Sequence, residues 1–254
     1  MSAIVEVKDL CKTYVVNKRQ NHVLRNVSFN VEEGEFISVM GPSGSGKSTL
    51  LYNVSGMDKM TAGSVVFDGQ ELAGLNENQM AGLRLNKMGF IFQHIYLLKN
   101  LGIMDNVIVS AYMAKKKNRK EVNADAVALL KRTGIVQLAD NDITQASGGE
   151  LQRTAICRAL INSPKILFAD EPTGALNSKA AAEIMELLLD INKAGTTIMI
   201  VTHDAKVAAK SERVLYMVDG NIKGEYNLDK FSGSETDIKE REVNLSKWLF
   251  NMGW

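Results

Sequence analysis

The chain of 254 residues has little cysteine and no excess of charge of either sign. Its two cysteines, Cys11 and Cys157, lie far apart and form no CxxC pair. This spacing argues against a disulfide framework or a zinc site and favours a reducing cytosol. The formal net charge of +1 provides no overall basic field, so we expect no nucleic-acid partner.

Long apolar runs are also missing from the sequence. No stretch approaches the roughly 20 residues that a membrane-crossing helix requires, and internal repeats are absent. The first residues carry Glu6 and Asp9, where a secretory signal would be apolar. We therefore expect a protein that is soluble by itself and reaches a membrane only through a partner.

Strand patterns and helix patterns alternate along the chain. Val27, Phe29 and Val31 alternate with polar residues, as in a half-buried strand. Short apolar runs typical of buried strands follow at residues 36–40, 64–67, 166–169, 198–201 and 214–218. Residues 76–150 are rich in helix patterns and poor in strand patterns. This alternation predicts an α/β fold with a mainly parallel sheet and helices on its faces.

Residues 41–49 read GPSGSGKST, a full match to the phosphate-binding pattern GxxxxGK[ST]. The run follows an apolar strand and leads into a predicted helix, so its backbone N–H groups can converge on phosphate oxygens. Lys47 supplies positive charge for the terminal phosphates, and the hydroxyl of Ser48 suits Mg²⁺. This loop alone would fit a kinase, a GTPase or any motor. The residues expected to contact the nucleotide are Gly41, Pro42, Ser43, Gly44, Ser45, Gly46, Lys47, Ser48 and Thr49.

A second cluster of chemistry follows the apolar run KILFAD, residues 165–170. Asp170 ends the predicted strand, where a carboxylate can hold Mg²⁺ through water. Glu171 comes next and can polarise the attacking water as a general base. The alternative is a pair of solvated carboxylates in a loop.

Residues 146–153, the signature segment, read ASGGELQR and precede a helix predicted at Thr154–Leu160. Ser147, Gly148 and Gly149 would repeat the anion-binding chemistry of the phosphate loop at a second helix start. One chain with two such starts but a single lysine-bearing loop suggests that each nucleotide is shared. The simplest arrangement is a head-to-tail pair of two copies of the chain.

Together these segments resemble the nucleotide-binding subunits of ABC transporters. GPSGSGKST is similar to the family's Walker A motif, SGGELQR to its signature motif and KILFADE to its Walker B strand. The resemblance covers about residues 4–225 and implies an ATPase that uses ATP and Mg²⁺, with Glu171 catalytic. It also implies that Ser147, Gly148, Gly149 and Glu150 contact the ATP held by the second copy.

The fold implied by the resemblance is a P-loop NTPase (RecA-like) core. It has a mainly parallel sheet, an N-terminal antiparallel β region and an inserted α-helical subdomain. The implied boundaries are 4–227 for the ATP-binding domain, about 95–160 for the helical subdomain within it, and 228–254 for a C-terminal helical extension.

Single positions also match the family. Gln93, in GFIFQ, resembles the Q-loop residue that touches Mg²⁺ and couples the site to a permease. His203, in VTHD, resembles the switch histidine that contacts the terminal phosphate and catalyses with Glu171. Tyr14 resembles the aromatic residue on which adenine stacks, although a strand-end tyrosine could merely pack. Asn177 stands where the D-loop of most relatives has an aspartate.

Other segments resemble narrower branches of the family. GFIFQ and SGGE resemble the lipoprotein-release and macrolide-export branch, and PTGALNSK and KWLFNMGW resemble the bacitracin-type (Bce-type) ATPases of peptide-antibiotic resistance and sensing. This resemblance implies an integral membrane permease as partner, a place at the cytoplasmic face of the cell membrane, and a sensor kinase reached through the permease. The alternative is a soluble ABC ATPase of the iron–sulfur assembly or repair type, which drives no transport.

The last residues carry a helical stripe. Leu245, Trp248, Leu249 and Met252 share one face at helical spacing. The helix could pack on its own domain, or Trp248 and Trp254 could dock a partner. The run KKKNRK, residues 115–120, is expected to be a solvated loop, with contact to acidic lipid headgroups as the alternative.

Overall fold

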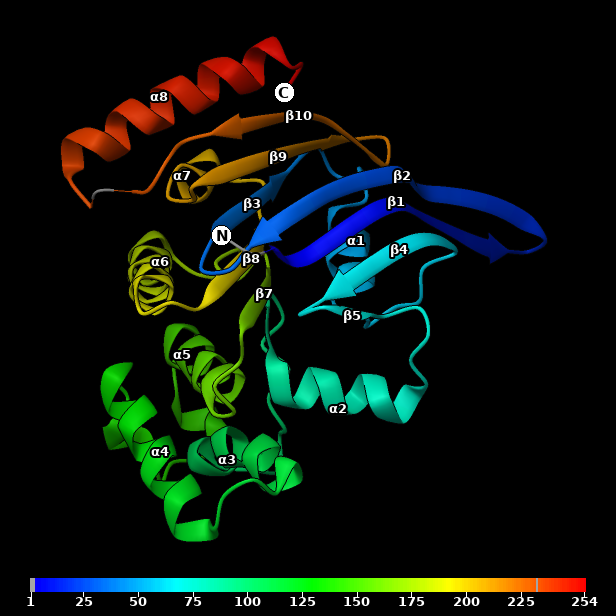
Figure 1. Ribbon diagram of the computed structural model, residues 1–254. Helices are drawn as coiled ribbons and strands as arrows, with labels where there is room; N and C mark the ends of the chain where they lie inside the picture. The colour runs from blue at the N-terminus through cyan, green and yellow to red at the C-terminus, as the bar shows by residue number, and fades with distance from the viewer. Residues whose placement is uncertain (1–2, 232) are drawn as a thin grey trace. The chain divides into compact units, whose positions relative to one another are not determined.

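The computed structural model describes residues 3–231 and 233–254 (Figure 1). The chain divides into two compact units. The first unit comprises Met1–Met80 and Thr197–Trp254, and the second unit comprises Ala81–Thr196. The fold is that of an α/β P-loop NTPase with an N-terminal antiparallel sheet and a group of helices, as the sequence predicts.

The first unit begins with an antiparallel sheet in the order β2-β1-β4-β5. β1 (Ala3–Val16) and β2 (Arg19–Glu32) form a long hairpin, and β4 (Ala62–Phe67) and β5 (Gln70–Glu71) form a short one. Val27, Phe29 and Val31 are buried on one face of β2, which confirms the predicted alternation.

Parallel strands form the remaining sheet of the first unit. β3 (Phe36–Met40) lies between β8 (Thr197–Val201) and β9 (Arg213–Val218) and is parallel to both. β10 (Asn221–Asn227) pairs with β9 in the antiparallel direction. Every residue of β3 and β8 is buried, as expected of strands covered on both faces. α1 (Lys47–Val54) follows β3, and the short α7 (Ala205–Ala208) follows β8.

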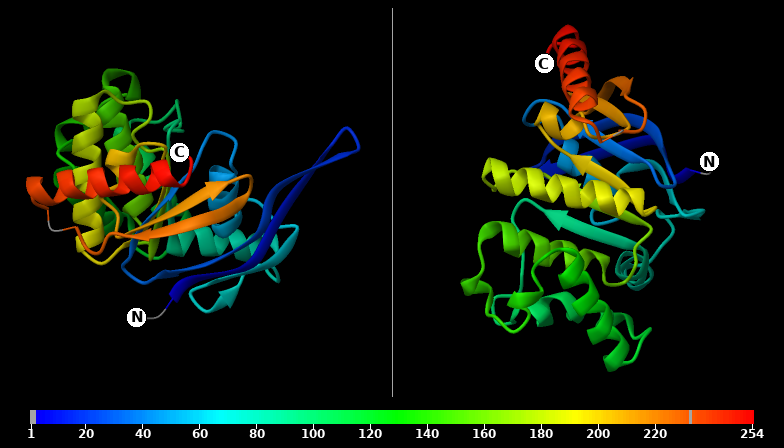
Figure 2. Two further views of the ribbon diagram at one scale, coloured as in Figure 1. Left: turned by 90° about the horizontal axis from the view of Figure 1, so that it is seen from above. Right: turned by 90° about the vertical axis from the view of Figure 1, so that its left-hand side faces the viewer.

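The C-terminal helix α8 (Glu235–Asn251) belongs to the first unit and packs against its strands β9 and β10 (Figure 2). Leu245 and Leu249 are fully buried in one cluster with Tyr216 of β9. The Trp248 ring lies 6.1 Å from the Tyr216 ring and 5.2 Å from the Tyr226 ring, measured between centroids. Trp248 therefore packs within its own unit, which is the first of the two roles that the sequence left open for this helix.

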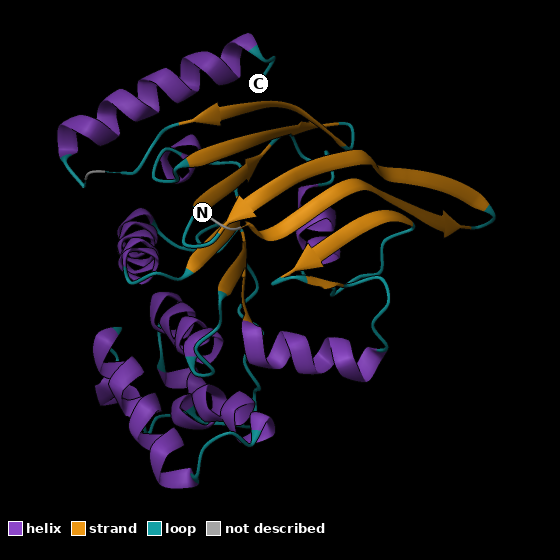
Figure 3. Cartoon of the chain, viewed as in Figure 1, coloured by secondary structure: helices purple, strands orange, loops and turns teal. Residues whose placement is uncertain are grey.

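The second unit is built mainly of helices (Figure 3). α2 (Glu77–Lys87) leads into it, and β6 (Met88–Phe92) pairs in parallel with β7 (Ile166–Asp170). The remaining helices are α3 (Ile103–Ala114), α4 (Arg119–Arg132), α5 (Gly148–Leu160) and α6 (Ser178–Lys193), with short 3-10 turns at Val136–Leu138 and Ile143–Gln145.

The core of α3, α4 and α5 is a single apolar cluster that includes Ile103, Val122, Leu130 and Cys157. The sequence pattern missed β6, because a five-residue apolar run between helices shows no alternation that would mark a strand. Among the described residues, no helix is both long enough and apolar enough to cross a membrane.

Candidate functional site

The phosphate loop, residues 41–49, runs from the end of β3 into the first turn of α1 in the first unit. Gly41 adopts φ +154°, and a Cβ added there would collide with the carbonyl oxygen of Met217. α1 starts after Gly46, and no side chain caps that start among the described residues. The ammonium of Lys47 is buried in the loop and donates hydrogen bonds to Gly41 O (2.7 Å) and Pro42 O (2.9 Å). The loop thus combines a helix N-terminus with a cation, the chemistry that holds phosphate.

Ser45 shows that the loop suits a further group. Its hydroxyl is buried and has no hydrogen-bond partner within the described part of the chain. Buried hydroxyls of this kind are nearly always bonded, and a phosphate oxygen would satisfy this one. Ser48, in the first turn of α1, adds a hard oxygen ligand of the kind that Mg²⁺ prefers. The loop residues therefore fit a polyphosphate with its magnesium ion.

Tyr14 and His203 also lie in the first unit. His203 is exposed two residues after β8, at the carboxyl end of a parallel strand, where ligands bind in such sheets. Tyr14, near the end of β1, is 36% exposed, and its hydroxyl donates a hydrogen bond to Asp58 Oδ2 at 2.6 Å. Burial, followed by the hydrogen bond to Asp58 and the charge of that carboxylate, raises the pKa of Tyr14.

In the second unit, the ends of β6 and β7 bring three predicted residues together. Asp170, the last residue of β7, pairs in register with Phe92, the last residue of β6. Gln93 and Glu171 therefore follow at adjacent strand ends. A Cβ added to Gly174 would lie 2.9 Å from Gln93 Nε2 and 3.3 Å from Glu171 Oε2, so both side chains converge beside this glycine. The oxygen-bearing side chains of this edge fit a hard cation such as Mg²⁺.

The backbone at Glu171 is strained. Its φ of +45° lies in the left-handed region, which costs a non-glycine residue ~1–3 kcal/mol. Such strain persists only where the surroundings impose it, and it gathers at functional sites. The turn after β7 therefore holds the Glu171 carboxylate in a chosen direction.

Gln152, which the sequence analysis did not single out, ties these strand ends together. It is 1% exposed, and its Nε2 donates to Phe92 O at 3.2 Å and to Pro172 O at 2.8 Å. The two carbonyls belong to the residues that precede Gln93 and follow Glu171. The only sequence feature that points to Gln152 is its position within SGGELQR, in the first turns of α5.

The signature segment begins α5 six residues earlier than the sequence predicted, with Ser147 as the N-cap and Gly148 as the first helical residue. The expected start at Thr154 is wrong because Ser147 and Glu150 form a capping box. Ser147 N and Ser147 Oγ donate to Glu150 Oε2 at 2.8 and 2.7 Å, and Glu150 N donates to Ser147 Oγ at 3.4 Å. The bond from the Ser147 backbone, followed by that from its hydroxyl, lowers the pKa of Glu150.

A cavity of about 630 Å³ adjoins this helix start. Ser147, Gly148 and Gly149 line it from one side and residues 175–177 from the other. Asn177 caps α6, because its Oδ1 accepts from Ala180 N at 2.9 Å. Aspartate would cap this helix equally well, so asparagine keeps the helix start and removes only a negative charge from the cavity.

The predicted residues therefore fall into two groups. Tyr14, the phosphate loop and His203 belong to the first unit. Gln93, Asp170 and Glu171 meet at one edge of the second unit, and the signature residues share a cavity with Asn177 in that same unit.

Comparisons with known proteins point in the same direction. The family model for "ABC transporter" matches residues 24–174. The dimeric structure of MJ0796, a bacterial ABC transporter cassette, is 39% identical, with a TM-score of 0.83, and the match covers 89% of this chain and 100% of that one. A post-hydrolysis structure of the same cassette, bound to ADP and Pi, gives the same values. The structure of cbiO1 from Clostridium perfringens, part of the ABC transporter complex cbiONQ, is 28% identical, with a TM-score of 0.81 and coverage of 100% of both chains.

Proposed function

This chain belongs to the ABC transporter family as an ATPase cassette, and on that premise we propose that it powers a membrane permease that handles antimicrobial peptides. The ATP-driven part of the proposal rests on the pair of anion-binding helix starts, at α1 and at α5. Only the first carries a lysine in its loop, so each is half of a nucleotide site. A second copy of the chain supplies the other half.

The proposed dimer is head-to-tail. The phosphate loop of one copy and Ser147, Gly148 and Gly149 of the other hold the same ATP, and two-fold symmetry makes two such sites. The pairing of two copies is supported by the MJ0796 cassette, whose structure is dimeric. In each site Lys47 neutralises the terminal phosphates, and Ser147 directs its hydroxyl toward them once it leaves the Glu150 carboxylate.

The proposed chemistry is hydrolysis of the terminal phosphoryl bond. Glu171 accepts a proton from the attacking water, and His203 stabilises the charge that grows on the terminal phosphate. Ser48, Asp170 and Gln93 are the residues that would hold Mg²⁺, which supplies neutralisation of the phosphate charge when bound. Tyr14 stacks on the adenine, and Glu150 and Asn177 complete the partner's side of the site.

The permease and its cargo are the finer part of the proposal. The permease is supported by cbiO1, a cassette that forms part of a transporter complex. A role in resistance to, or sensing of, bacitracin-like and lantibiotic-like peptides is supported by residues 172–179 and 247–254, which resemble the bacitracin-type ATPases. The cassette would then sit at the cytoplasmic face of the membrane, peripheral to the permease, and a sensor kinase would receive its signal through the permease.

The hydrolysis step is tested by two substitutions. Lys47→Ala removes tight ATP binding, because the phosphates lose their buried cation. Glu171→Gln preserves binding and traps an ATP-bound dimer, because proton acceptance is lost while every phosphate contact stays. ATP affinity, turnover and sedimentation measure these effects. Normal turnover in the Glu171→Gln protein would refute its assignment as the base.

The cellular role is tested by deleting the gene and measuring growth against a panel of cell-wall-active peptides. We expect increased sensitivity that the wild-type gene restores and the Glu171→Gln gene does not. Purification of the chain in detergent should bring down a polytopic membrane protein. A purely soluble partner, with unchanged peptide sensitivity, would reject the permease proposal.

A further inference from the structure

A buried lysine lies behind the ring of Tyr14. Lys12 is on the same face of β1, two residues earlier, and is 7% exposed. Its Nζ lies 4.6 Å from the centroid of the Tyr14 ring. It also donates to Asp58 Oδ1 at 2.7 Å and to Lys59 O at 2.6 Å. One face of the ring is therefore covered by a cation that is itself held by two acceptors.

The hydroxyl end of the ring is held as well. Tyr14 OH donates to Asp58 Oδ2 at 2.6 Å. The ring is therefore held at its hydroxyl by Asp58 and covered on one face by Lys12.

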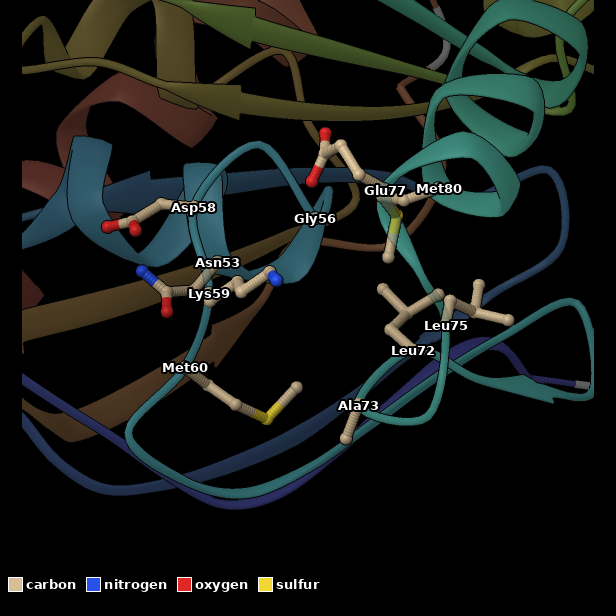
Figure 4. Close-up of a pocket in the computed structure, with 10 residues that line it drawn as sticks. All are labelled: Asn53, Gly56, Asp58, Lys59, Met60, Leu72, Ala73, Leu75, Glu77 and Met80. Carbon is tan, nitrogen blue, oxygen red and sulfur yellow. The ribbon is translucent and has the colours of Figure 1, made fainter.

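Asp58 is placed for this purpose by the loop after α1. Backbone N–H groups of Met57 and Asp58 both donate to Tyr52 O, at 2.8 and 3.0 Å. Asp58 borders a cavity of about 140 Å³ that Leu72 and Leu75 also line, and Figure 4 shows that its carboxylate points away from these two leucines. Its two oxygens accept from Lys12 and from Tyr14.

The charge of Asp58 is secured by these contacts. Burial alone would raise its pKa, but the hydrogen bonds from Lys12 and Tyr14 and the charge of Lys12 outweigh burial and lower it. By contrast, Lys8 on the same strand is 71% exposed and pairs with Glu6 at 3.5 Å. Of these two lysines of β1, only the one behind Tyr14 is buried.

We propose that Lys12 and Asp58 are positioning residues that hold the Tyr14 ring as a preformed stacking platform for the base of the bound nucleotide. This proposal rests on the proposed function, in which Tyr14 stacks on adenine. Lys12 occupies one face of the ring, so the flat aromatic base takes the opposite, exposed face. A ring that is already fixed loses little side-chain entropy when the base arrives, and affinity rises for that reason.

The test compares a ligand that has a base with one that has none. The affinities of the full-length protein for ATP and for inorganic tripolyphosphate are measured by competition with a fluorescent nucleotide. The variants are Lys12→Met and Asp58→Ala, each alone and combined with Tyr14→Ala. Lys8→Met, the same substitution at the exposed site of the same strand, is the matched control.

We expect Tyr14→Ala to raise the Kd for ATP about tenfold, the size of one stacked base. Lys12→Met and Asp58→Ala should each raise it about threefold to tenfold through lost preorganisation. Neither should change the Kd for tripolyphosphate, and neither should weaken ATP binding further in the Tyr14→Ala background. Lys8→Met should bind both ligands as the wild type does. Asp58 is partly exposed, so Asp58→Ala provides the same test if Lys12→Met does not fold.

The outcomes separate the two levels of the argument. If Tyr14→Ala binds ATP and tripolyphosphate as the wild type does, the assignment of Tyr14 to the base fails, and the platform with it. If Tyr14→Ala weakens only ATP binding while Lys12→Met and Asp58→Ala leave it unchanged, the platform fails and the base assignment stands. A loss that also affects tripolyphosphate, or that persists without Tyr14, would mean a structural role only.

Discussion

Replacing Gln152 with methionine removes both hydrogen bonds that tie β6 to the turn after β7, with little change in side-chain volume. Gln152 Nε2 is the donor to Phe92 O and Pro172 O, and both acceptors lose it. Gln152 Oε1 is buried and has no partner among the described residues, so its loss removes no bond. The substitution therefore isolates the tie itself.

The magnitude follows from the two bonds. A buried acceptor that loses its donor costs about 1–1.5 kcal/mol, so the unfolding free energy should fall by about 2–3 kcal/mol. The effect on hydrolysis has a different origin. Gln93 and Glu171, the proposed magnesium ligand and general base, adjoin the two residues whose carbonyls are tied. Misplacing a catalytic group by about 1 Å can cost a hundredfold in rate. We expect kcat to fall at least about tenfold by the same argument.

The assay pairs urea unfolding with steady-state ATP hydrolysis. KM for ATP should change little, because the phosphate loop lies in the other unit. Gln137→Met, an exposed glutamine in the same unit, is the matched control and should change neither quantity. A Gln152→Met protein with wild-type kcat and a reduced unfolding free energy would refute the positioning argument, since the tie would then serve stability alone.

Further predictions concern other parts of the molecule. Arg241→Met should lower the unfolding free energy in urea by about 3–5 kcal/mol, because four backbone carbonyls lose their donor, whereas the exposed Lys247→Met should not. At pH 8 a thiol reagent should label Cys11 and spare Cys157 until guanidinium unfolds the chain, because burial raises the pKa of Cys157 to about 11; rapid labelling of both thiols in the folded protein would contradict this. If Tyr14 stacks on the base as proposed, GTP should bind within about tenfold of ATP, because the Tyr14 hydroxyl is bonded to Asp58 and stacking tolerates any base. Strong discrimination in a competition assay would show that another group hydrogen-bonds to the edge of the base.

Local patterns predicted much of the fold and the site. The phosphate loop is set by glycines and a lysine within residues 41–49, and the structure places them between a buried strand and a helix as expected. The alternation in β2 and the stripe of α8 likewise depend on short repeats. The start of α5 is set by the capping box of Ser147 and Glu150, which is also a local signal, and the apolar pattern alone places that start too late.

The residues that the sequence did not reveal are polar ones whose partners lie far along the chain. Lys12 looks like an ordinary solvated residue, and its acceptor on Asp58 lies 46 residues away. Arg241 stands in the charged run KERE, yet it is 6% exposed and donates to backbone carbonyls near β9 and β10. No pattern within either segment distinguishes these side chains from exposed neighbours.

By itself, the sequence determined that this chain binds and hydrolyses ATP, because phosphate binding needs particular residue types at short, fixed spacings. The tertiary structure decided which polar side chains are buried, and hence that Lys12 and Asp58 hold Tyr14 and that Gln152 holds the turn beside Glu171. Burial of a charge or an amide depends on acceptors that folding brings from distant segments, and that proximity exists only once the chain has folded.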